Sequence, residues 1–558
     1  MKRREFFKRS ASLGIAVGAG FTPAGLALAA IDQQVAGGAA SASGDDLAIV
    51  NARLVTLNPR QGTADGVLVR NGRIARVGPS SDVKKEAREA RVFDAAGRTI
   101  VPGLIDAHTH FEMTCNARAH QTAVHTPPLK SLREIKDVVR AKAAQSRPGD
   151  WIIARGSFGM AGRVEEKRLL SREELDLVTD RHPVIVFSGF HVAMFNTAGL
   201  KAAGLWDPNS RSIPRAATIH RDASGVPTGV ATEVWTTLPA YTREQVRASI
   251  KQYTPPLFTA KGITTVHTLP YGPDDVRAIQ DLHATGDLPL RVRVFYHVPH
   301  VTSLESVLSL GLVTGTGDDM FQFGGIKIFV DGIGNDGLGK ALDDVKWTQP
   351  ELNDFVARAD AADIQLMMHT LTDKGEQMAM DALVHAAGRG ARRRSHRLEH
   401  ADGGEDIAVI RRFKQLDLRP VITVSDPAPA SAGARRVRRT PRWKTMVQEG
   451  IEPIAVSDTT GTVPDFSPLG GIAHMMTASN DGGSAPAGET LTFDDALRTY
   501  TIFPARSAYE DRDKGSIEVG KLADFAVLSA DPRTLSGSQL WDVKVDATIL
   551  GGRIVHGQ

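Results

Sequence analysis

The chain of 558 residues is several times longer than a typical domain and can bury a large core. Hydrophobic residues make up 42% and charged residues 23% of the sequence, which excludes a disordered, collagen-like or multi-spanning membrane protein. The formal net charge of +3 would favour acidic partners, and the single cysteine, Cys115, excludes an intramolecular disulfide and a cysteine metal cluster.

Residues 1–30 have the composition of an export signal. The opening MKRREFFK contains the pair Arg3-Arg4, a Gly-rich apolar run follows, and the segment ends with the letters ALA at residues 27–29. These features resemble a bacterial twin-arginine signal peptide with its cleavage site, and an uncleaved N-terminal anchor is the alternative. We therefore expect the twin-arginine (Tat) export machinery as a partner and a periplasmic or secreted protein.

The basic charge is concentrated in this first segment. Five basic side chains stand there against Glu5 alone, so residues 31–558 carry a formal net charge of −1. A chain near neutrality has no general attraction to nucleic acid or to an acidic membrane, so we expect neither partner and no integral membrane insertion. The basic run at residues 435–444 is interpreted either as a solvated rim or as an attractor for an anionic substrate group.

Short strands are predicted near both ends of the folded chain. Residues 31–45 have a linker composition. Residues 46–100 contain β-branched alternation and a hairpin signal, and short strands return in residues 515–558. Because each set is too small to fold alone, we expect both chain ends to form one small β-sandwich domain.

The long middle, residues 101–514, alternates short apolar runs with helical patterns, which is typical of β/α units around a parallel sheet. Eight runs are interpreted as strands, at residues 100–107, 262–269, 291–298, 325–330, 364–369, 397–400, 420–424 and 453–457. Eight such units predict an α/β fold, a (β/α)₈ TIM barrel with insertions. The largest insertion is expected at residues 111–260, between the first and second strands.

Side chains able to bind a metal ion stand at the ends of these strands. The first run ends in PGLIDAHTH, where His108 and His110 are two residues apart and so point to one side of a strand. Lys327 lies inside the apolar run IKIFVDG, where an unpaired ammonium is costly to bury. Further donors close later runs: His369, His400 and Asp458. Because the carboxyl ends of barrel strands form the catalytic face, this set of nitrogen and oxygen donors indicates a metal site.

The motifs PGLIDAHTH, IKIFVDG, RLEH and VSD resemble the amidohydrolase superfamily, and more narrowly its YtcJ-like branch, which includes N-substituted formamide deformylases. The resemblance runs through almost the whole chain after the signal. It implies six metal ligands: His108, His110, Lys327, His369, His400 and Asp458. It also implies two divalent ions bridged by a carboxylated Lys327, with an unmodified lysine beside a single ion as the alternative. Zinc suits this ligand set, and manganese, iron or cobalt also fit it.

Two segments depart from the pattern of this branch. Thr370-Leu371-Thr372 follows His369 where the branch usually has Ala-Ile-Gly, and a threonine follows His267 where it commonly has aspartate. His191 lies in the segment GFHVAMFN, which resembles a segment near the substrate pocket of the branch. Two interpretations of His191 stay open: it contacts the substrate or the oxyanion, or it only packs in the core.

The resemblance implies hydrolysis of a carbon–nitrogen bond in an amide, formamide, cyclic amide or carbamate by a metal-activated hydroxide. Asp458 would accept the proton of the water and pass it to the leaving nitrogen, and His191 would share the oxyanion charge. The alternatives are a mononuclear deaminase without Lys327, an ester, lactone or phosphoester hydrolase on the same site, and a binding protein with a vestigial site. The substrate is expected to be a small molecule, and a homodimer is compatible with this branch.

Overall fold

The structure is a computed structural model. It describes residues 46–214, 217–332, 345, 347–388, 395–401, 406–424, 441–461, 466–477, 479–480, 483–484 and 488–557. The predicted signal and linker lie outside the described residues, as does the basic run between residues 435 and 440. Residues 45–558 form one compact unit, and the division of the chain into the predicted domains stays a prediction.

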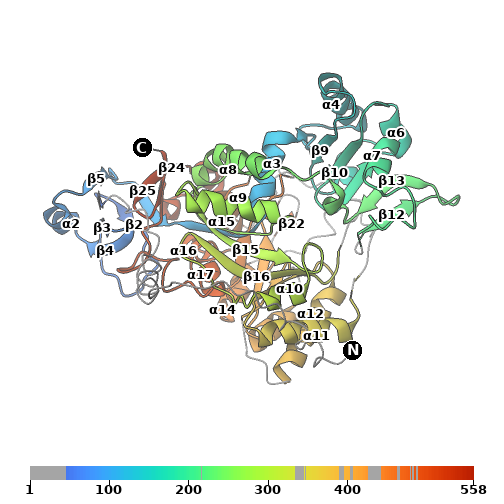
Figure 1. The fold of residues 1–558 in the computed structure, drawn as a ribbon. Coiled ribbons are helices and arrows are strands. Elements are labelled where there is room, and N and C mark those ends of the chain that lie inside the picture. The colour runs from blue at the N-terminus through green and yellow to red at the C-terminus, as the bar shows by residue number, and fades with distance from the viewer. Residues whose placement is uncertain are drawn as a thin grey trace, which may run out of the picture. The chain divides into compact units, whose positions relative to one another are not determined.

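The predicted eight-stranded parallel sheet is confirmed. Two of its strands, β15 and β16, are labelled in Figure 1. Its strands are β7 (Leu104–Thr109), β14 (Ile263–Thr268), β15 (Arg291–His297), β16 (Phe321–Phe329), β17 (Leu366–His369), β18 (Arg397–Glu399), β19 (Arg419–Thr423) and β20 (Ile454–Val456). They follow one another in chain order across the sheet. All neighbouring pairs are parallel, and each strand is buried along most of its length. The fold is therefore an α/β barrel of the TIM type.

The first predicted strand, at residues 100–107, divides into two. Residues Thr99–Pro102 form β6, which pairs with strands outside the barrel, and β7 begins only at Leu104. Between them, a Cβ atom on Gly103 would lie 2.3 Å from the Thr264 Oγ1 atom of β14. A side chain at position 103 therefore has no room where the chain passes from one sheet to the other.

The two outer strands of the barrel sheet meet at their carboxyl ends. The backbone N–H of Asp458, just after β20, donates to the carbonyl of His108 in β7 at 2.9 Å. The N–H of His110 donates to the carbonyl of Thr459 at 3.0 Å. These hydrogen bonds bring the first and the last predicted metal ligands side by side.

Residues between β7 and β14 build a second sheet, as the predicted insertion requires. Its strands, in sheet order, are β12 (Thr218–Arg221), β13 (Pro227–Thr232), β11 (Val192–Phe195), β10 (Val184–Ser188), β9 (Ile152–Gly156) and β8 (Thr122–Ala123). The helices between β7 and β14 are α3 (Phe111–His120), α4 (Leu132–Gln145), α5 (Met160–Arg163), α6 (Arg172–Asp176), α7 (Thr197–Ala202) and α8 (Arg243–Leu257). Buried apolar residues on β9, β10 and α4 give this insertion a core of its own.

Helices follow most barrel strands and cover the sheet. They are α9 (Pro273–Ala284), α10 (Leu304–Ser309), α11 (Gln349–Ala361), α12 (Asp373–Gly388), α13 (Ile407–Gln415), α14 (Trp443–Gln448), α15 (Pro468–Thr477), α16 (Phe493–Arg498) and α17 (Ile502–Ser507). A short hairpin, β21 (Ser479–Asn480) and β22 (Gly483–Ser484), follows α15. Among the described residues, no helix combines the length and the apolar character needed to span a bilayer.

Two small sheets contain the strands from the chain ends. One holds β4 (Arg73–Gly78), β3 (Gly66–Arg70), β1 (Leu47–Val50) and β5 (Arg91–Asp94), with α2 (Ser80–Ala87) packed on it. The other holds β2 (Arg53–Leu54), β6, β23 (Phe525–Leu528), β24 (Val545–Leu550) and β25 (Arg553–Gly557). The two sheets share one apolar core, which includes Ile49, Val67, Phe525 and Ile549. That they form a separate β-sandwich domain stays a prediction.

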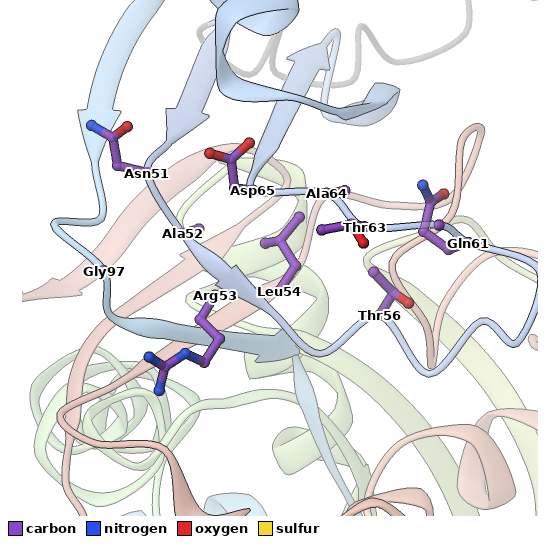
Figure 2. A pocket seen from close by; sticks show the side chains of 11 residues that line it. Asn51, Ala52, Arg53, Leu54, Thr56, Gln61, Thr63, Ala64, Asp65 and Gly97 are labelled. Atoms are coloured by element: carbon purple, nitrogen blue, oxygen red, sulfur yellow. The ribbon is translucent and has the colours of Figure 1, made fainter.

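A cleft of about 750 Å³ opens beside the first small sheet, between residues 51–56 and residues 61–65 (Figure 2). Its polar groups bond within the protein: Ala52 N–H donates to the carbonyl of Asp65, and the Asp65 carboxylate accepts from the N–H of Ser80. No predicted metal ligand lines it. The cleft therefore does not belong to the predicted site.

Candidate metal centre at the carboxyl ends of the barrel strands

The structure brings the first and last predicted ligands to one point. His108 lies in β7, His110 directly follows it, and Asp458 lies two residues after β20. Their nearest ligand atoms all lie within 4.8 Å of one another. Asp458 Oδ1 is 3.5 Å from His108 Nε2 and 3.4 Å from His110 Nε2. Three donors from both edges of the sheet thus face one small volume.

The other three predicted ligands lie next to this group. Lys327 Nζ, in β16, is 3.5 Å from His108 Nε2. The ring centroid of His400, just after β18, is 4.9 Å from that of His108 and 4.6 Å from that of His369 at the end of β17. Six donors from five barrel strands therefore form one cluster, and their role as metal ligands stays a prediction.

Hydrogen bonds at the outer ring nitrogens orient two of the histidines. The Nδ1 atom of His108 bonds to the Glu399 carboxylate, and the Nδ1 atom of His110 bonds to the Tyr271 hydroxyl at 2.8 Å. With Nδ1 as the donor, each ring presents the Nε2 lone pair to Asp458, as metal-binding imidazoles do. Neither Glu399 nor Tyr271 was singled out from the sequence, although Glu399 stands beside His400 in the RLEH motif.

Electrostatics also favour the metal-binding forms of these groups. Burial lowers the pKa of His110 to about 4, and burial together with neighbouring cations lowers the pKa of His369. Burial alone would raise the pKa of Asp458, but the imidazoles of His400, His110 and His108 more than offset this and lower it. Neutral imidazoles and an ionised carboxylate are the forms that bind metal ions.

Lys327 is buried among these donors. Its side chain makes no ion pair with the described residues, and its ammonium lies 5.2 Å from the centroid of the Phe329 ring. Burial lowers the pKa of Lys327 to about 8, although the charges of Glu399 and Asp458 oppose the shift. The amine is therefore far easier to deprotonate than a surface lysine.

The arrangement of these groups fits a divalent cation. The Nε2 atom of His369 is buried and has no hydrogen-bond partner among the described residues. A buried imidazole nitrogen left unpaired is costly unless a cation or a water fills the space beside it. The set contains nitrogen and oxygen atoms and no sulfur, which suits zinc and other borderline divalent ions.

His191 reaches the cluster from the insertion. Its ring centroid lies 5.2 Å from that of His369, and its Nδ1 atom bonds to Glu233 Oε1 at 2.8 Å. The other oxygen of Glu233 accepts from Trp235 Nε1 at 3.1 Å. Burial lowers the pKa of His191, but the charge of Glu233 and its hydrogen bond raise it more, so the net shift is upward. Nothing in the local sequence marked Glu233, since it stands 42 residues after its partner.

His297, the last residue of β15, was also missed from the sequence. It pairs in register with Lys327, and its ring stacks on Phe329 at 5.5 Å between centroids. The ring is fully buried, and neither nitrogen has a hydrogen-bond partner within the described part of the chain. Cys115, by contrast, is buried in α3, where burial raises the pKa of its thiol, so it is not an activated nucleophile.

A parallel α/β barrel with histidine, lysine and aspartate donors at its strand ends defines the class of metal-dependent hydrolases. Residues 91–556 match the family model described as the amidohydrolase family, so the chain belongs to that family. The predicted enzyme class, a metal-dependent hydrolase acting on carbon–nitrogen bonds, is thereby confirmed.

Curated relatives extend over nearly the whole chain. An N-substituted formamide deformylase from Arthrobacter pascens is 27% identical over 547 residues, covering 91% of this chain and 97% of the relative. The YtcJ amidohydrolase of Bacillus subtilis is 26% identical, covering 88% of this chain and 96% of the relative. These similarities confirm the predicted YtcJ-like branch.

A solved metal-dependent hydrolase from Pyrococcus horikoshii has a similar fold. Its TM-score is 0.65 at 20% identity, and the alignment covers 88% of this chain and 98% of that one. At this identity the likeness supports the barrel fold alone.

Proposed function

We propose that this protein is an exported hydrolase that cleaves the carbon–nitrogen bond of an amide, formamide, cyclic amide or carbamate with two zinc ions. The observation that carries the proposal is the convergence of His108, His110 and Asp458 within 4.8 Å, with Lys327 beside them. Similarity to an N-substituted formamide deformylase supports an amide-type substrate. Export is supported by the twin-arginine pattern of residues 1–30.

The six donors divide naturally into two groups. His108, His110 and Asp458 would hold one ion, and His369 and His400 would hold the other. Lys327, carboxylated by carbon dioxide, would bridge the two. Its amine is buried next to His108 and has no counter-ion among the described residues, which suits a group that becomes an anionic ligand.

Such ions, when bound, supply the Lewis acidity that activates a water molecule and the substrate carbonyl. The protein contributes the proton transfers. Asp458 accepts the proton of the attacking water and delivers it to the leaving nitrogen. Protonated His191, the form that its raised pKa favours, would donate from Nδ1 to Glu233 and direct its Nε2–H toward the developing oxyanion. His297 offers a second buried imidazole to the same substrate.

Metal analysis tests the number of ions. Protein purified from the exported fraction is expected to contain about two equivalents of zinc per chain, and Lys327→Ala is expected to contain about one or fewer. One equivalent in fully active wild-type protein would favour the mononuclear deaminase alternative, which would use His108, His110, His369 and Asp458.

Replacement of Asp458 tests the assigned chemistry. Asp458→Asn is expected to lower kcat on a panel of formamides, acyl amides, cyclic amides and carbamates by about 10²- to 10⁴-fold, because it removes the proton carrier. Asp287→Asn is the control, since that carboxylate pairs with Lys251 on the surface. Undiminished turnover in Asp458→Asn with added zinc would contradict the proposed role. Turnover of esters alone would favour the esterase alternative.

A further inference from the structure

Four arginine side chains of the described residues are buried, and three of them pair with a carboxylate. Arg291 bonds to Asp524 through two nitrogens, Arg293 pairs with Glu510 at 3.2 Å, and Arg397 bonds to Glu399. The fourth is Arg155, in strand β9 of the insertion, with 3% of its surface exposed. Arg155 is therefore unusual, because a buried charge is normally paired with an opposite charge.

The described neighbours of Arg155 are neutral. Its Nε atom donates to Gln121 Oε1 at 2.9 Å, and one terminal nitrogen lies 3.5 Å from the carbonyl of Gly189. The guanidinium stands 4.1 Å from the centroid of the Phe187 ring. None of its contacts within the described residues is with a carboxylate, and the ionisable groups that act on its charge are Tyr241 and Tyr271. Burial lowers the pKa of Arg155 to about 10; Tyr241 and Tyr271 oppose the shift in part, and no carboxylate of the described residues adds to their effect.

Residues near the guanidinium also contact the predicted metal ligands. Tyr271, which acts electrostatically on Arg155, bonds to the predicted ligand His110. Gly189, whose carbonyl faces Arg155, directly precedes Phe190, and the Phe190 ring stacks on His110 at 5.3 Å. On the other side, a Cβ atom on Gly461, three residues after Asp458, would lie 4.0 Å from Arg155 Cγ. Segments on two sides of the metal ligands thus contact this arginine.

The positive charge of Arg155, which no described carboxylate neutralises, indicates that the site binds an anion. Phe187 and the carbonyl oxygen stabilise a cation but do not neutralise it. A guanidinium matches a carboxylate, which can accept two parallel hydrogen bonds from it, and the bond to the Gly189 carbonyl uses only one of the four terminal N–H groups of Arg155. A single arginine balances one negative charge, so a monoanion suits it better than a phosphate dianion.

We propose that Arg155 binds a carboxylate of the substrate, so that the hydrolysed amide carries a carboxylate group on one side of its scissile bond. This inference rests on the proposed function. It places the specificity of the enzyme in the insertion, whose strand β9 holds the arginine, and not in the barrel strands that hold the metal ligands.

Substrate pairs test the proposal in the wild-type protein. N-formylglycine, N-formyl-β-alanine and N-formyl-4-aminobutyrate place the carboxylate at increasing distances from the amide, and the primary amide of each is its neutral match. At the best length, kcat/KM for the acid is expected to exceed that for the neutral match by on the order of 30-fold or more. Equal or better hydrolysis of the neutral compound at every length would overturn the proposal.

Binding measurements distinguish the proposed carboxylate site from the proposed hydrolysis. Titration calorimetry on Asp458→Asn measures the same compounds without turnover. Acids that bind while the wild-type protein hydrolyses none of the compounds would support Arg155 and contradict the chemistry. Hydrolysis without preference, or no binding of any acid to either protein, would contradict the carboxylate site.

Substitutions test whether Arg155 causes the preference for the carboxylate-bearing substrate. Arg155→Met is expected to remove the preference for the acid, and Arg155→Lys to keep part of it through its charge. Arg221→Met is the matched control, because Arg221 lies in the same sheet and bonds to the backbone carbonyls of Trp206 and Gly225. An acid preference that is the same in Arg155→Met as in wild type would overturn the proposal.

Discussion

Buried arginines at the amino ends of the barrel strands have carboxylate partners, whereas some buried polar groups near the carboxyl ends lack partners among the described residues. At the amino ends of the strands, Arg291 and Arg293 begin β15 and are paired with Asp524 and Glu510. Near the carboxyl ends, His297 has no hydrogen-bond partner at either ring nitrogen, and Arg155, in β9 of the insertion, has no carboxylate partner, both within the described residues. The two arginine–carboxylate pairs connect the barrel to the C-terminal segment. The side chains of His297 and Arg155 remain available to bind a ligand. The paired groups at the amino ends therefore stabilise the fold, whereas the groups without partners near the carboxyl ends lower its stability and serve ligand binding.

Breaking a paired charge should have the largest effect on stability. Arg291→Met is expected to lower the free energy of unfolding by about 3–5 kcal/mol, because it leaves Asp524 buried without its cation. Chemical denaturation measures the loss. Activity per folded molecule should stay near wild type, since Arg291 is not among the metal-site residues. A loss below about 1 kcal/mol would contradict the distinction between the two ends.

Removing a hydroxyl at the opposite end should act on the metal and not on the fold. Tyr271→Phe deletes the hydrogen-bond partner of His110 Nδ1, and zinc affinity is expected to fall about 10- to 100-fold. Competition with a chelator measures the affinity. The control is Tyr296→Phe, because the Tyr296 ring packs against Phe323 and not against the metal ligands. Equal affinities in the two variants would argue against a positioning role for Tyr271.

The amino end should also respond to pH. Burial alone would raise the pKa of Asp524, but Arg291 more than offsets this and holds the pKa below its usual value of 3.8. A depressed folded-state pKa contributes stability above the unfolded value, and this contribution is lost as the pH falls through the folded value. The stability difference between wild type and Asp524→Asn should thus be constant near neutral pH and shrink below about pH 4. Denaturation across pH 2–7 measures it, and a difference that grows on acidification would be contrary to expectation.

Removing the unpaired arginine should have the smallest effect on stability. Arg155→Met leaves no carboxylate without a partner, so the free energy of unfolding is expected to change by no more than about 1 kcal/mol, the worth of the bond to Gln121. The comparison with Arg291→Met uses the same substitution in an equally buried setting. A loss for Arg155→Met as large as that for Arg291→Met would remove the basis for calling Arg155 a binding group.

Local sequence patterns predicted much of the fold and of the candidate site. His108 and His110 could be placed on one strand face from their spacing, and His369, His400 and Asp458 from their positions after apolar runs. Strand ends are local features, so a single sequence can show them. The division at Gly103 could not be predicted, because it depends on the contact with Thr264 on another strand.

The sequence by itself determined which residue types stand at the strand ends and that sulfur ligation is excluded, since both follow from composition and short-range spacing. Only the tertiary structure decided which groups have partners. Glu233 and His191 meet across 42 residues, and Tyr271 and His110 across 161, whereas Arg155 has no carboxylate partner within the described part of the chain. Pairing depends on distances of a few Å between segments remote in the chain, and no local pattern encodes such distances.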